Sequence, residues 1–305
     1  MDDQVNRLYR ELPSVGDVLS GEETATLLTQ FSRELVTDAA RKVLARLREQ
    51  VRAGAHDEVS IQAAVAGIFA ALQQELSFLT RPSLRRVINA TGVILQTNLG
   101  RAPLSEAALA AIVDVARGYC NVELDLATGE RSRRDVHVET LILNVLSTRL
   151  GKSIESLQER YAAAVVNNCA AATFLGLNTM AERGEVIVSR GELVEIGGGF
   201  RIPDILRKSG AILREVGTTN RTRIADYEAA ITPETRLILR VHQSNFRIEG
   251  FTERPALAEL KELSIRTSIP IFDDQGTGCL VSLDEYGIRD EAAWTESLRV
   301  GPDLV

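Results

Sequence analysis

The sequence has few cysteines and no long apolar run. Its 305 residues include only Cys120, Cys169 and Cys279, and no two of them form a C-x-x-C pair. This scarcity argues against a disulfide framework or a bound metal such as zinc, and it predicts a reducing compartment, the cytoplasm. No apolar run approaches the roughly 20 residues that a membrane helix needs. We therefore expect a cytoplasmic protein with no membrane segment.

Positive charge is also in deficit, because the formal net charge is −7 at pH 7. This balance argues against non-specific nucleic-acid binding by the whole chain, although a local basic face is compatible with it. The first residues are acidic and lack the apolar core of a secretory signal. With 45% hydrophobic residues over this length, the chain can bury a large core and is expected to form about two domains.

Residues 1–82 read as an all-helical domain without strand-like runs. Leu27, Phe31, Leu35 and Leu44 fall near one face of a stretch from about residue 24 to 52, which predicts one long amphipathic helix. A second helix is expected from about residue 60 to 80. The domain boundary is placed near Pro82, and residues 83–305 form the second domain.

The other face of the long predicted helix is rich in positive charge. A solvated helix face explains such a pattern without any function. A face that contacts RNA is the alternative, because clustered cations attract phosphates. The residues alone leave both interpretations open, and the basic residues are Arg41, Lys42, Arg46, Arg48 and Arg52.

The second domain alternates short apolar runs with amphipathic helices, the pattern of a mainly parallel α/β sheet. Ligands of open α/β sheets bind at the carboxyl ends of the strands, so polar residues at those ends are the candidate site. We expect strands at residues 162–166, 185–189, 211–216, 237–242 and 270–274, and helices at 170–182, 223–231 and 255–267.

The last predicted strand ends on two carboxylates, Asp273 and Asp274, followed by a turn that contains Thr277. Side chains alternate between the faces of a strand, so only one carboxylate is expected to meet a ligand, and we favour Asp274. A buried carboxylate needs a cationic partner to stay ionised. The alternative is that Asp274 only caps the turn after it.

Other strand ends carry polar groups toward the same edge. Asn168, Cys169 and Ala170 form a turn into a helix of small residues, where free N–H groups favour a phosphate. An ordinary strand-to-helix turn explains the same residues. His242 and Asn245 follow another strand, and a lone histidine is more often a packing residue than a ligand. The combination of three such strand ends is what favours a site.

Four further residues in polar turns are candidates for binding an anionic substrate. Arginine forms paired hydrogen bonds with phosphate and other oxyanions, although surface solvation explains any single arginine. The candidates are Arg86, with Arg85 as its alternative, and Arg101, Asn220 and Arg221.

Long stretches of the chain resemble the bacterial selenocysteine synthase family, the L-seryl-tRNA(Sec) selenium transferases. They are residues 87–92 (VINATG), 97–104 (TNLGRAPL), 188–198 (VSRGELVEIGG), 200–205, 215–222 and 244–252. The resemblance implies a fold-type-I enzyme that uses pyridoxal 5′-phosphate. Such an enzyme converts seryl-tRNA(Sec) to selenocysteinyl-tRNA(Sec) with selenophosphate, through an aminoacrylyl intermediate. It also implies that residues 1–82 bind tRNA and that the protein is a homo-oligomer, with dimers assembled into a larger ring.

Carried over by position, the resemblance places Asn168, Cys169 and Ala170 at the cofactor phosphate and Asp274 at its pyridine nitrogen. It places His242 near the ring and Asn245 near the phenolic oxygen, and Thr277 retains a hydroxyl in the turn. Cys169 stands where the family commonly has Asn, and Gln275 is a second departure.

The family pattern continues past Asp303, Leu304 and Val305 with a Ser-Gly-Asp-Lys loop that holds the Schiff-base lysine. The last lysine here is Lys261, so we expect a chain truncated before that lysine and inactive by itself. Two other functions stay open: a related pyridoxal-phosphate lyase that acts on a free amino acid, and a non-catalytic tRNA-binding or assembly fragment.

Overall fold

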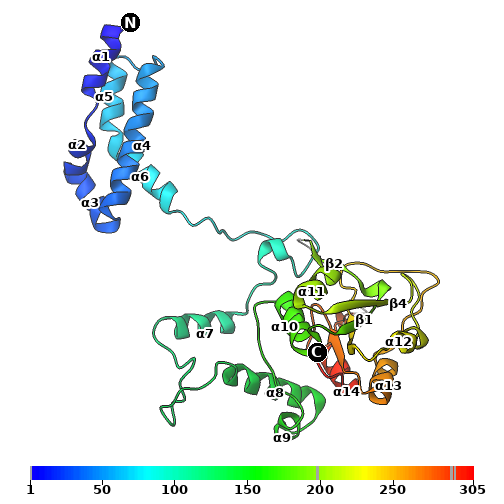
Figure 1. Ribbon diagram of the computed structural model, residues 1–305. Helices are drawn as coiled ribbons and strands as arrows, with labels where there is room; N and C mark the ends of the chain where they lie inside the picture. The colour runs from blue at the N-terminus through cyan, green and yellow to red at the C-terminus, as the bar shows by residue number, and fades with distance from the viewer. Residues whose placement is uncertain (1, 197–198, 289–290, 292) are drawn as a thin grey trace. The chain divides into compact units, whose positions relative to one another are not determined.

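The computed structural model describes residues 2–196, 199–288, 291 and 293–305 (Figure 1). The chain divides into two compact units, a helical unit of residues 1–99 and an α/β unit of residues 100–305. The helical unit contains α1 (Asp2–Glu11), α2 (Val15–Ser20), α3 (Glu22–Gln30), α4 (Arg33–Arg52), α5 (Glu58–Ala66), α6 (Ile68–Thr80) and a short 3-10 turn, η1 (Thr97–Leu99).

The core of the helical unit lies between α4 and the helices around it. Val36, Ala39, Ala40, Val43 and Leu44 are buried, and positions 36, 39/40 and 43/44 follow one another at intervals of three or four residues along α4. They pack with apolar residues of α6 and α2, among them Leu72. This spacing puts one apolar stripe on one side of the helix, which explains why the amphipathic pattern could be recognised in the sequence.

Two helices expected to be continuous are broken in the structure. The stretch from residue 24 to 52 is α3 and α4, separated at Phe31 and Ser32, because the Ser32 hydroxyl caps α4 by accepting a hydrogen bond from the Leu35 N–H at 3.3 Å. The stretch from 60 to 80 is α5 and α6, separated at Gly67. Ser favours the N-cap and Gly is a poor helix former.

No single helix among the described residues is long and apolar enough to cross a membrane. Within the described part of the chain, α5 and α6 together have the length and composition of such a span, but they are bent by 53° where they meet.

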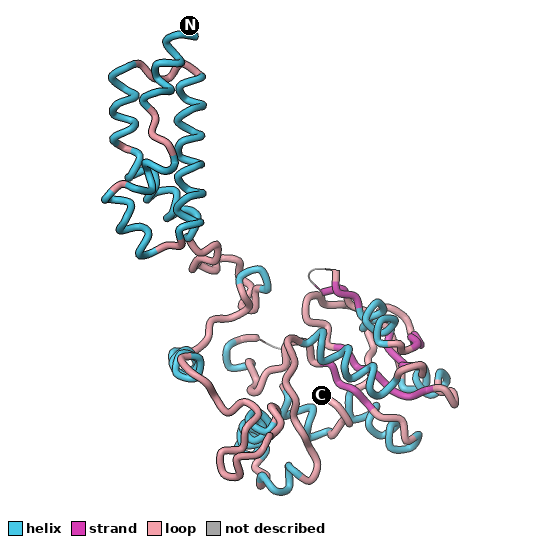
Figure 2. The backbone as a smooth tube through the Cα atoms, turned by 60° about the vertical axis from the view of Figure 1, so that its left-hand side comes forward, coloured by secondary structure: helices cyan, strands magenta, loops and turns pink. Residues whose placement is uncertain are grey.

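The α/β unit contains a four-stranded sheet in the order β4-β1-β5-β6, with all neighbours parallel. Its strands are the magenta segments of Figure 2, and helices, in cyan, lie around them. The predicted parallel α/β class is therefore confirmed. The strands are β1 (Glu185–Ser189), β4 (Ile212–Val216), β5 (Thr235–Val241) and β6 (Ile271–Asp274), and β2 (Glu195–Ile196) pairs separately with β3 (Phe200–Arg201). The helices are α7 (Glu106–Ala116), α8 (Val136–Leu150), α9 (Ile154–Gln158), α10 (Cys169–Ala181), α11 (Ile202–Ser209), α12 (Ile224–Ala230), α13 (Leu257–Thr267) and α14 (Trp294–Val300), with 3-10 turns η2 (Arg190–Glu192) and η3 (Asp284–Tyr286).

Helices cover both faces of the sheet (Figure 1). Val186 and Val188 of β1 face α10 and α11 in one apolar cluster, whereas Ile187 faces α12 and α13 in another. Because the inner strands β1 and β5 are buried on both faces, they read as mostly apolar runs. The edge strand β4 is largely exposed and includes Arg214 and Glu215.

The predicted strand at residues 162–166 is absent, because these residues are irregular and Val165 is 65% exposed. An apolar run becomes a strand only when a neighbour supplies its hydrogen bonds. None of the described strands pairs with this segment. The other four strands and the three predicted helices are confirmed, with bounds shifted by two residues at most.

Candidate functional site

Asp274 ends β6 at the carboxyl edge of the sheet and is buried, with 6% of its surface exposed. Its Oδ2 accepts a hydrogen bond from the Thr173 hydroxyl at 2.9 Å. Its Oδ1 accepts hydrogen bonds from the Gly276 N–H at 2.9 Å and the Cys169 thiol at 3.4 Å. Among the described residues, no Lys, Arg or His forms an ion pair with this carboxylate. Asp274 is therefore a buried anion held by neutral donors.

The helix that supplies two of these donors begins at the same edge. The Asn168 side chain caps α10 by accepting a hydrogen bond from the Ala171 N–H at 2.9 Å. Ala170 and the next two alanines give the first turn small side chains. A helix start of this kind favours an anion, because its free backbone N–H groups point outward and the helix dipole places partial positive charge there. The structure thus brings the predicted turn and Asp274 together.

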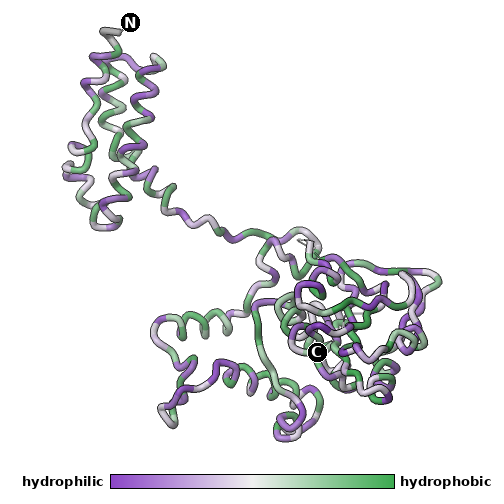
Figure 3. Tube along the Cα trace, viewed as in Figure 1, coloured by the Kyte–Doolittle hydropathy of each residue, from purple (hydrophilic) through white to green (hydrophobic). Residues whose placement is uncertain are grey.

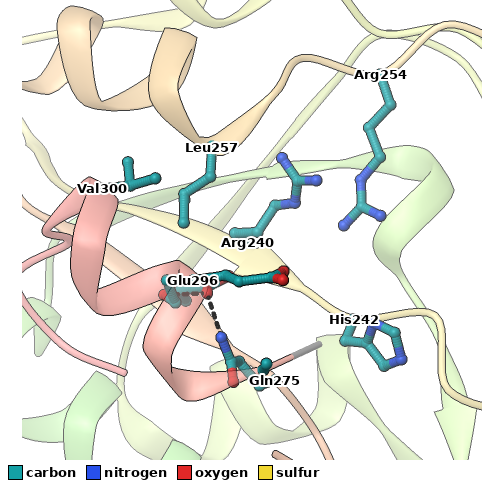
Figure 4. Close-up of a pocket in the computed structure, with 10 residues that line it drawn as sticks. Arg240, His242, Arg254, Leu257, Gln275, Glu296 and Val300 are labelled. Atoms are coloured by element: carbon teal, nitrogen blue, oxygen red, sulfur yellow. Dashed lines mark hydrogen bonds between the residues drawn. The ribbon is translucent and has the colours of Figure 1, made fainter. Parts of the chain in front are cut away.

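Asp273 lies on the opposite face of β6. Its Oδ2 accepts hydrogen bonds from Gln275 Nε2 at 3.0 Å and from the Ser297 hydroxyl at 2.6 Å. A cavity of about 240 Å³ beside it is lined by Arg240 and by residues of α13 and α14 (Figure 4). The register agrees, because Arg240 pairs with Asp273 and Val241 pairs with Asp274.

His242 shares the sheet edge with Asp274 but not its surroundings. The His242 backbone N–H donates to the Asp274 carbonyl at 2.9 Å. Its imidazole instead lines the cavity beside Asp273 (Figure 4), with Nε2 3.8 Å from a carboxylate oxygen of Glu291. The sequence predicted His242 at the carboxyl edge of the sheet, where it lies. The face on which its ring lies depends on the backbone after the end of β5, which the sequence pattern does not determine.

The remaining predicted ligands are held by other parts of the chain. Asn245 donates to the Glu195 carbonyl at 2.9 Å, and Thr277 is exposed. Asn220 and Arg221 both donate to the Phe251 carbonyl, at 2.7 and 3.3 Å, and so join two surface loops.

The two predicted arginines near the unit boundary are both exposed. Arg86 belongs to the helical unit and Arg101 to the α/β unit. Arg101 has a positive φ of 72°, a backbone conformation that is uncommon for a residue other than glycine.

Glu192 is a site residue that the sequence analysis missed. It is 1% exposed, and its carboxylate accepts hydrogen bonds from the Val241 N–H at 3.1 Å and from Arg254 Nε at 2.7 Å. Arg240 Nε lies 3.4 Å away. The ion pairs fix the carboxyl ends of β1 and β5 to the segment before α13. An acidic residue three positions after the end of a predicted strand was the available signal.

The predicted basic face of α4 is divided by its ion pairs. Lys42 and Arg46 both pair with Glu75 of α6, and Arg41 pairs with Asp38 at 3.0 Å. Arg48 and Arg52 are exposed and form no ion pair with any residue that the structure describes. Of the five predicted basic residues, the two without an ion pair among the described residues therefore lie toward the end of α4.

The surroundings of Asp274 also act on the Cys169 thiol. Burial of the sulfur, the negative charge of Asp274 and the hydrogen bond to it raise the pKa of the thiol to about 11. The thiol is therefore a neutral donor at pH 7, although part of the residue is exposed.

We expect Asp274→Asn to lower the pKa of the Cys169 thiol, because it removes the negative charge that opposes ionisation. Alkylation by iodoacetamide as a function of pH, with mass spectrometry at Cys169, measures this change. The exposed Cys120 is an internal reference for the reagent. Asp273→Asn is the matched control, and an equal shift in both variants would contradict the arrangement.

The fold and this edge define the class of the α/β unit: an open parallel sheet that presents a capped helix start and a buried carboxylate where such sheets bind ligands. The family model for L-seryl-tRNA selenium transferase matches residues 87–305, and the model for the selenocysteine synthase N terminus matches residues 9–48. The chain therefore belongs to the L-seryl-tRNA selenium transferase family.

Curated relatives agree with this assignment. The chain is 44% identical over 299 residues to the L-seryl-tRNA(Sec) selenium transferase of Geobacter sulfurreducens, and 42% identical over 299 residues to that of Aquifex aeolicus. These alignments cover 98% of this chain but 62% and 61% of the relatives.

A solved structure of D-glucosaminate-6-phosphate ammonia-lyase matches with a TM-score of 0.46 and 16% identity, over 62% of this chain and 48% of that one.

Proposed function

We propose that the protein that carries this chain converts L-seryl-tRNA(Sec) to L-selenocysteinyl-tRNA(Sec) in the cytoplasm, with selenophosphate as the selenium donor and pyridoxal 5′-phosphate as cofactor. The observation that carries the proposal is the buried Asp274 carboxylate beside the capped start of α10, in a chain of this family. The likeness to curated transferases supports the substrate.

The residues at this edge fit the proposed cofactor. The Asp274 carboxylate can accept about four hydrogen bonds, and the three observed donors leave room on Oδ2. No described cation balances its charge, so a protonated pyridine nitrogen suits it. The start of α10 suits a phosphate because its backbone N–H groups can donate to phosphate oxygens and the helix dipole is positive there. Bound there, the cofactor would supply an electron sink for reactions at the serine α- and β-carbons.

The chain's own residues would position the cofactor. Asn168, Cys169 and Ala170 would hold the phosphate, and Asp274 would keep a proton on the ring nitrogen. We retain His242, Asn245 and Thr277 as proposed ligands of the ring and its substituents. His242 and Asn245 would have to leave their present neighbours Glu291 and Glu195.

Substrate anions are the proposed partners of four basic or polar residues. Arg86 and Arg101 are exposed and able to form paired hydrogen bonds with selenophosphate. We propose that Asn220 and Arg221 also contact a substrate anion. Both side chains lie in a surface loop that they hold against the Phe251 carbonyl. Arg85 remains the alternative to Arg86.

The direct test uses serine-charged tRNA(Sec), selenophosphate and pyridoxal 5′-phosphate with the protein that carries this chain. We expect selenocysteinyl-tRNA(Sec), detected by mass spectrometry of the amino acid released from the tRNA. Selenium transfer to free serine instead of seryl-tRNA would favour a lyase-like enzyme of free amino acids. Absence of both products, with tRNA still bound, would favour a binding fragment.

We further propose that α4 binds tRNA through the positive charge near its end. Arg48→Ala with Arg52→Ala should lower affinity and reduce the salt slope by about 2, roughly one for each phosphate that is no longer neutralised. Lys42→Ala with Arg46→Ala should have a smaller effect, because both cations pair with Glu75, which offsets one of their two positive charges. Filter binding at several salt concentrations measures both variants, and equal slopes in both would contradict this division.

We also propose a homo-oligomer, with dimers in a larger ring. The feature of this chain that supports association is the exposed apolar surface of α7. None of its residues is buried, and the helix appears largely hydrophobic in Figure 3. Its exposed apolar side chains are Leu109, Ile112, Val113 and Val115. Exposed apolar patches of this kind mark association surfaces, and sedimentation of the protein tests whether it associates.

A further inference from the structure

Thr173 lies in the second turn of α10, with 1% of its surface exposed. Its hydroxyl is 2.9 Å from Asp274 Oδ2 and 2.9 Å from the Cys169 carbonyl oxygen. One hydroxyl has one proton, so it can donate to only one of these oxygens at a time. A charged oxygen is the stronger acceptor, so the proton belongs on the carboxylate.

The other carboxylate oxygen is held from a different direction. Gly276 donates its N–H to Oδ1 at 2.9 Å, from the turn after β6. Cys169 donates its thiol to the same oxygen at 3.4 Å. With donors on both oxygens, the carboxylate plane is fixed. Without Thr173, both remaining donors would act on Oδ1 and the group could turn about that oxygen.

We propose that Thr173 is a positioning residue for the cofactor: its hydroxyl fixes the Asp274 carboxylate so that Oδ2 accepts a hydrogen bond from the pyridine nitrogen. This inference rests on the proposed function. It assigns a role to a residue that binds neither substrate nor cofactor itself and acts only through Asp274. The raised pKa of the Cys169 thiol agrees with it, because the thiol stays a neutral donor to the same group.

The arrangement also separates the two carboxylates of β6. Asp273 is held by Gln275 and Ser297, both on its Oδ2, on the face of the cavity that Arg240 lines. Of the two carboxylates, the Thr173 hydroxyl donates to Asp274. A change at Thr173 should therefore alter ligand binding through Asp274 and leave the surroundings of Asp273 unchanged.

The test compares two ligands that differ at one atom. The first is pyridoxamine 5′-phosphate, which has no aldehyde and so needs no lysine, and the second is its analogue with the ring nitrogen replaced by carbon. Isothermal titration calorimetry on the 305-residue chain gives the ratio of the two affinities. A purely structural loss weakens both ligands equally, whereas a loss at the nitrogen weakens only the first.

We expect the wild-type chain to prefer the nitrogen ligand about tenfold or more, because the analogue cannot form the hydrogen bond to a charged group. Thr173→Val should remove most of this preference, and Thr173→Ser, which keeps the hydroxyl, should retain it. A preference that persists in Thr173→Val would overturn the inference while leaving the proposed function intact. No preference in the wild-type chain would overturn both.

Thr173→Ala, which also removes the hydroxyl and should lose the preference in the same way, replaces Thr173→Val if that variant does not fold. A further variant asks whether the Cys169 thiol shares the positioning role, and a loss of phosphate contacts at Cys169 would weaken both ligands equally. Cys169→Ala removes the weaker and longer donor on Oδ1, at a position that is partly exposed. The preference should then fall by about twofold at most, because a thiol is a weak donor. A complete loss of preference in Cys169→Ala would transfer the positioning role from Thr173 to Cys169.

Discussion

Asp274→Asn should lower the turnover of selenocysteinyl-tRNA(Sec) formation on the order of 10- to 1000-fold in the protein that carries this chain. An opposite charge shifts the pKa of its partner by about 1–3 units, and each unit corresponds to about tenfold in rate when the proton is needed. The amide keeps the size of the side chain but loses the charge that holds a proton on the ring nitrogen. Single-turnover measurements with charged tRNA determine the effect.

Asp273→Asn is the matched control for this prediction. Asp273 is a buried carboxylate on the same strand, 8% exposed, and it contacts Gln275 and Ser297 on the other face. Its replacement should change turnover far less than Asp274→Asn does. Equal turnover for Asp274→Asn and the wild type, or a larger loss for Asp273→Asn, would show that the ring lies elsewhere.

Glu192→Ala should lower the free energy of unfolding by about 3–5 kcal/mol, because breaking a buried ion pair leaves its partner uncompensated. Arg240 would lose its counter-charge while only 16% of its side chain is exposed. Burial already lowers the pKa of this guanidinium, with the charge of Glu192 acting in the opposite direction. Urea unfolding followed by circular dichroism gives the change.

Glu195→Ala is the control for Glu192→Ala. Glu195 pairs with Arg201 at 2.6 Å, but both side chains are more than half exposed, and such surface pairs contribute about 0–1 kcal/mol. If the two variants unfold at the same urea concentration, Glu192 does not join the ends of β1 and β5 as its contacts indicate.

Much of the sheet could be predicted because strands buried on both faces read as continuous apolar runs. The run at residues 162–166 has the same composition and is not a strand, because pairing depends on a neighbour and not on the run itself. In the helical unit, the apolar periodicity continues across Ser32 and Gly67 and therefore predicted two unbroken helices. In the structure both residues are caps that divide those helices.

The positions of the candidate site residues in the fold were predictable at the level of the sheet edge and of strand alternation. Alternation alone separated Asp273 from Asp274, and the register agrees. Thr173 was not predictable as a partner of Asp274, because 101 residues separate them and only the packing of α10 on β6 joins them. The ring of His242 lies beyond the end of its strand, where alternation no longer determines the face.

The most direct measurement is a crystal structure of this chain with pyridoxamine 5′-phosphate. We predict the phosphate at the first turn of α10, against Asn168, Cys169 and Ala170, and the ring nitrogen about 2.8 Å from Asp274 Oδ2, the length of a charge-assisted hydrogen bond. A ligand bound in the cavity beside Asp273, or in the helical unit, would contradict the account.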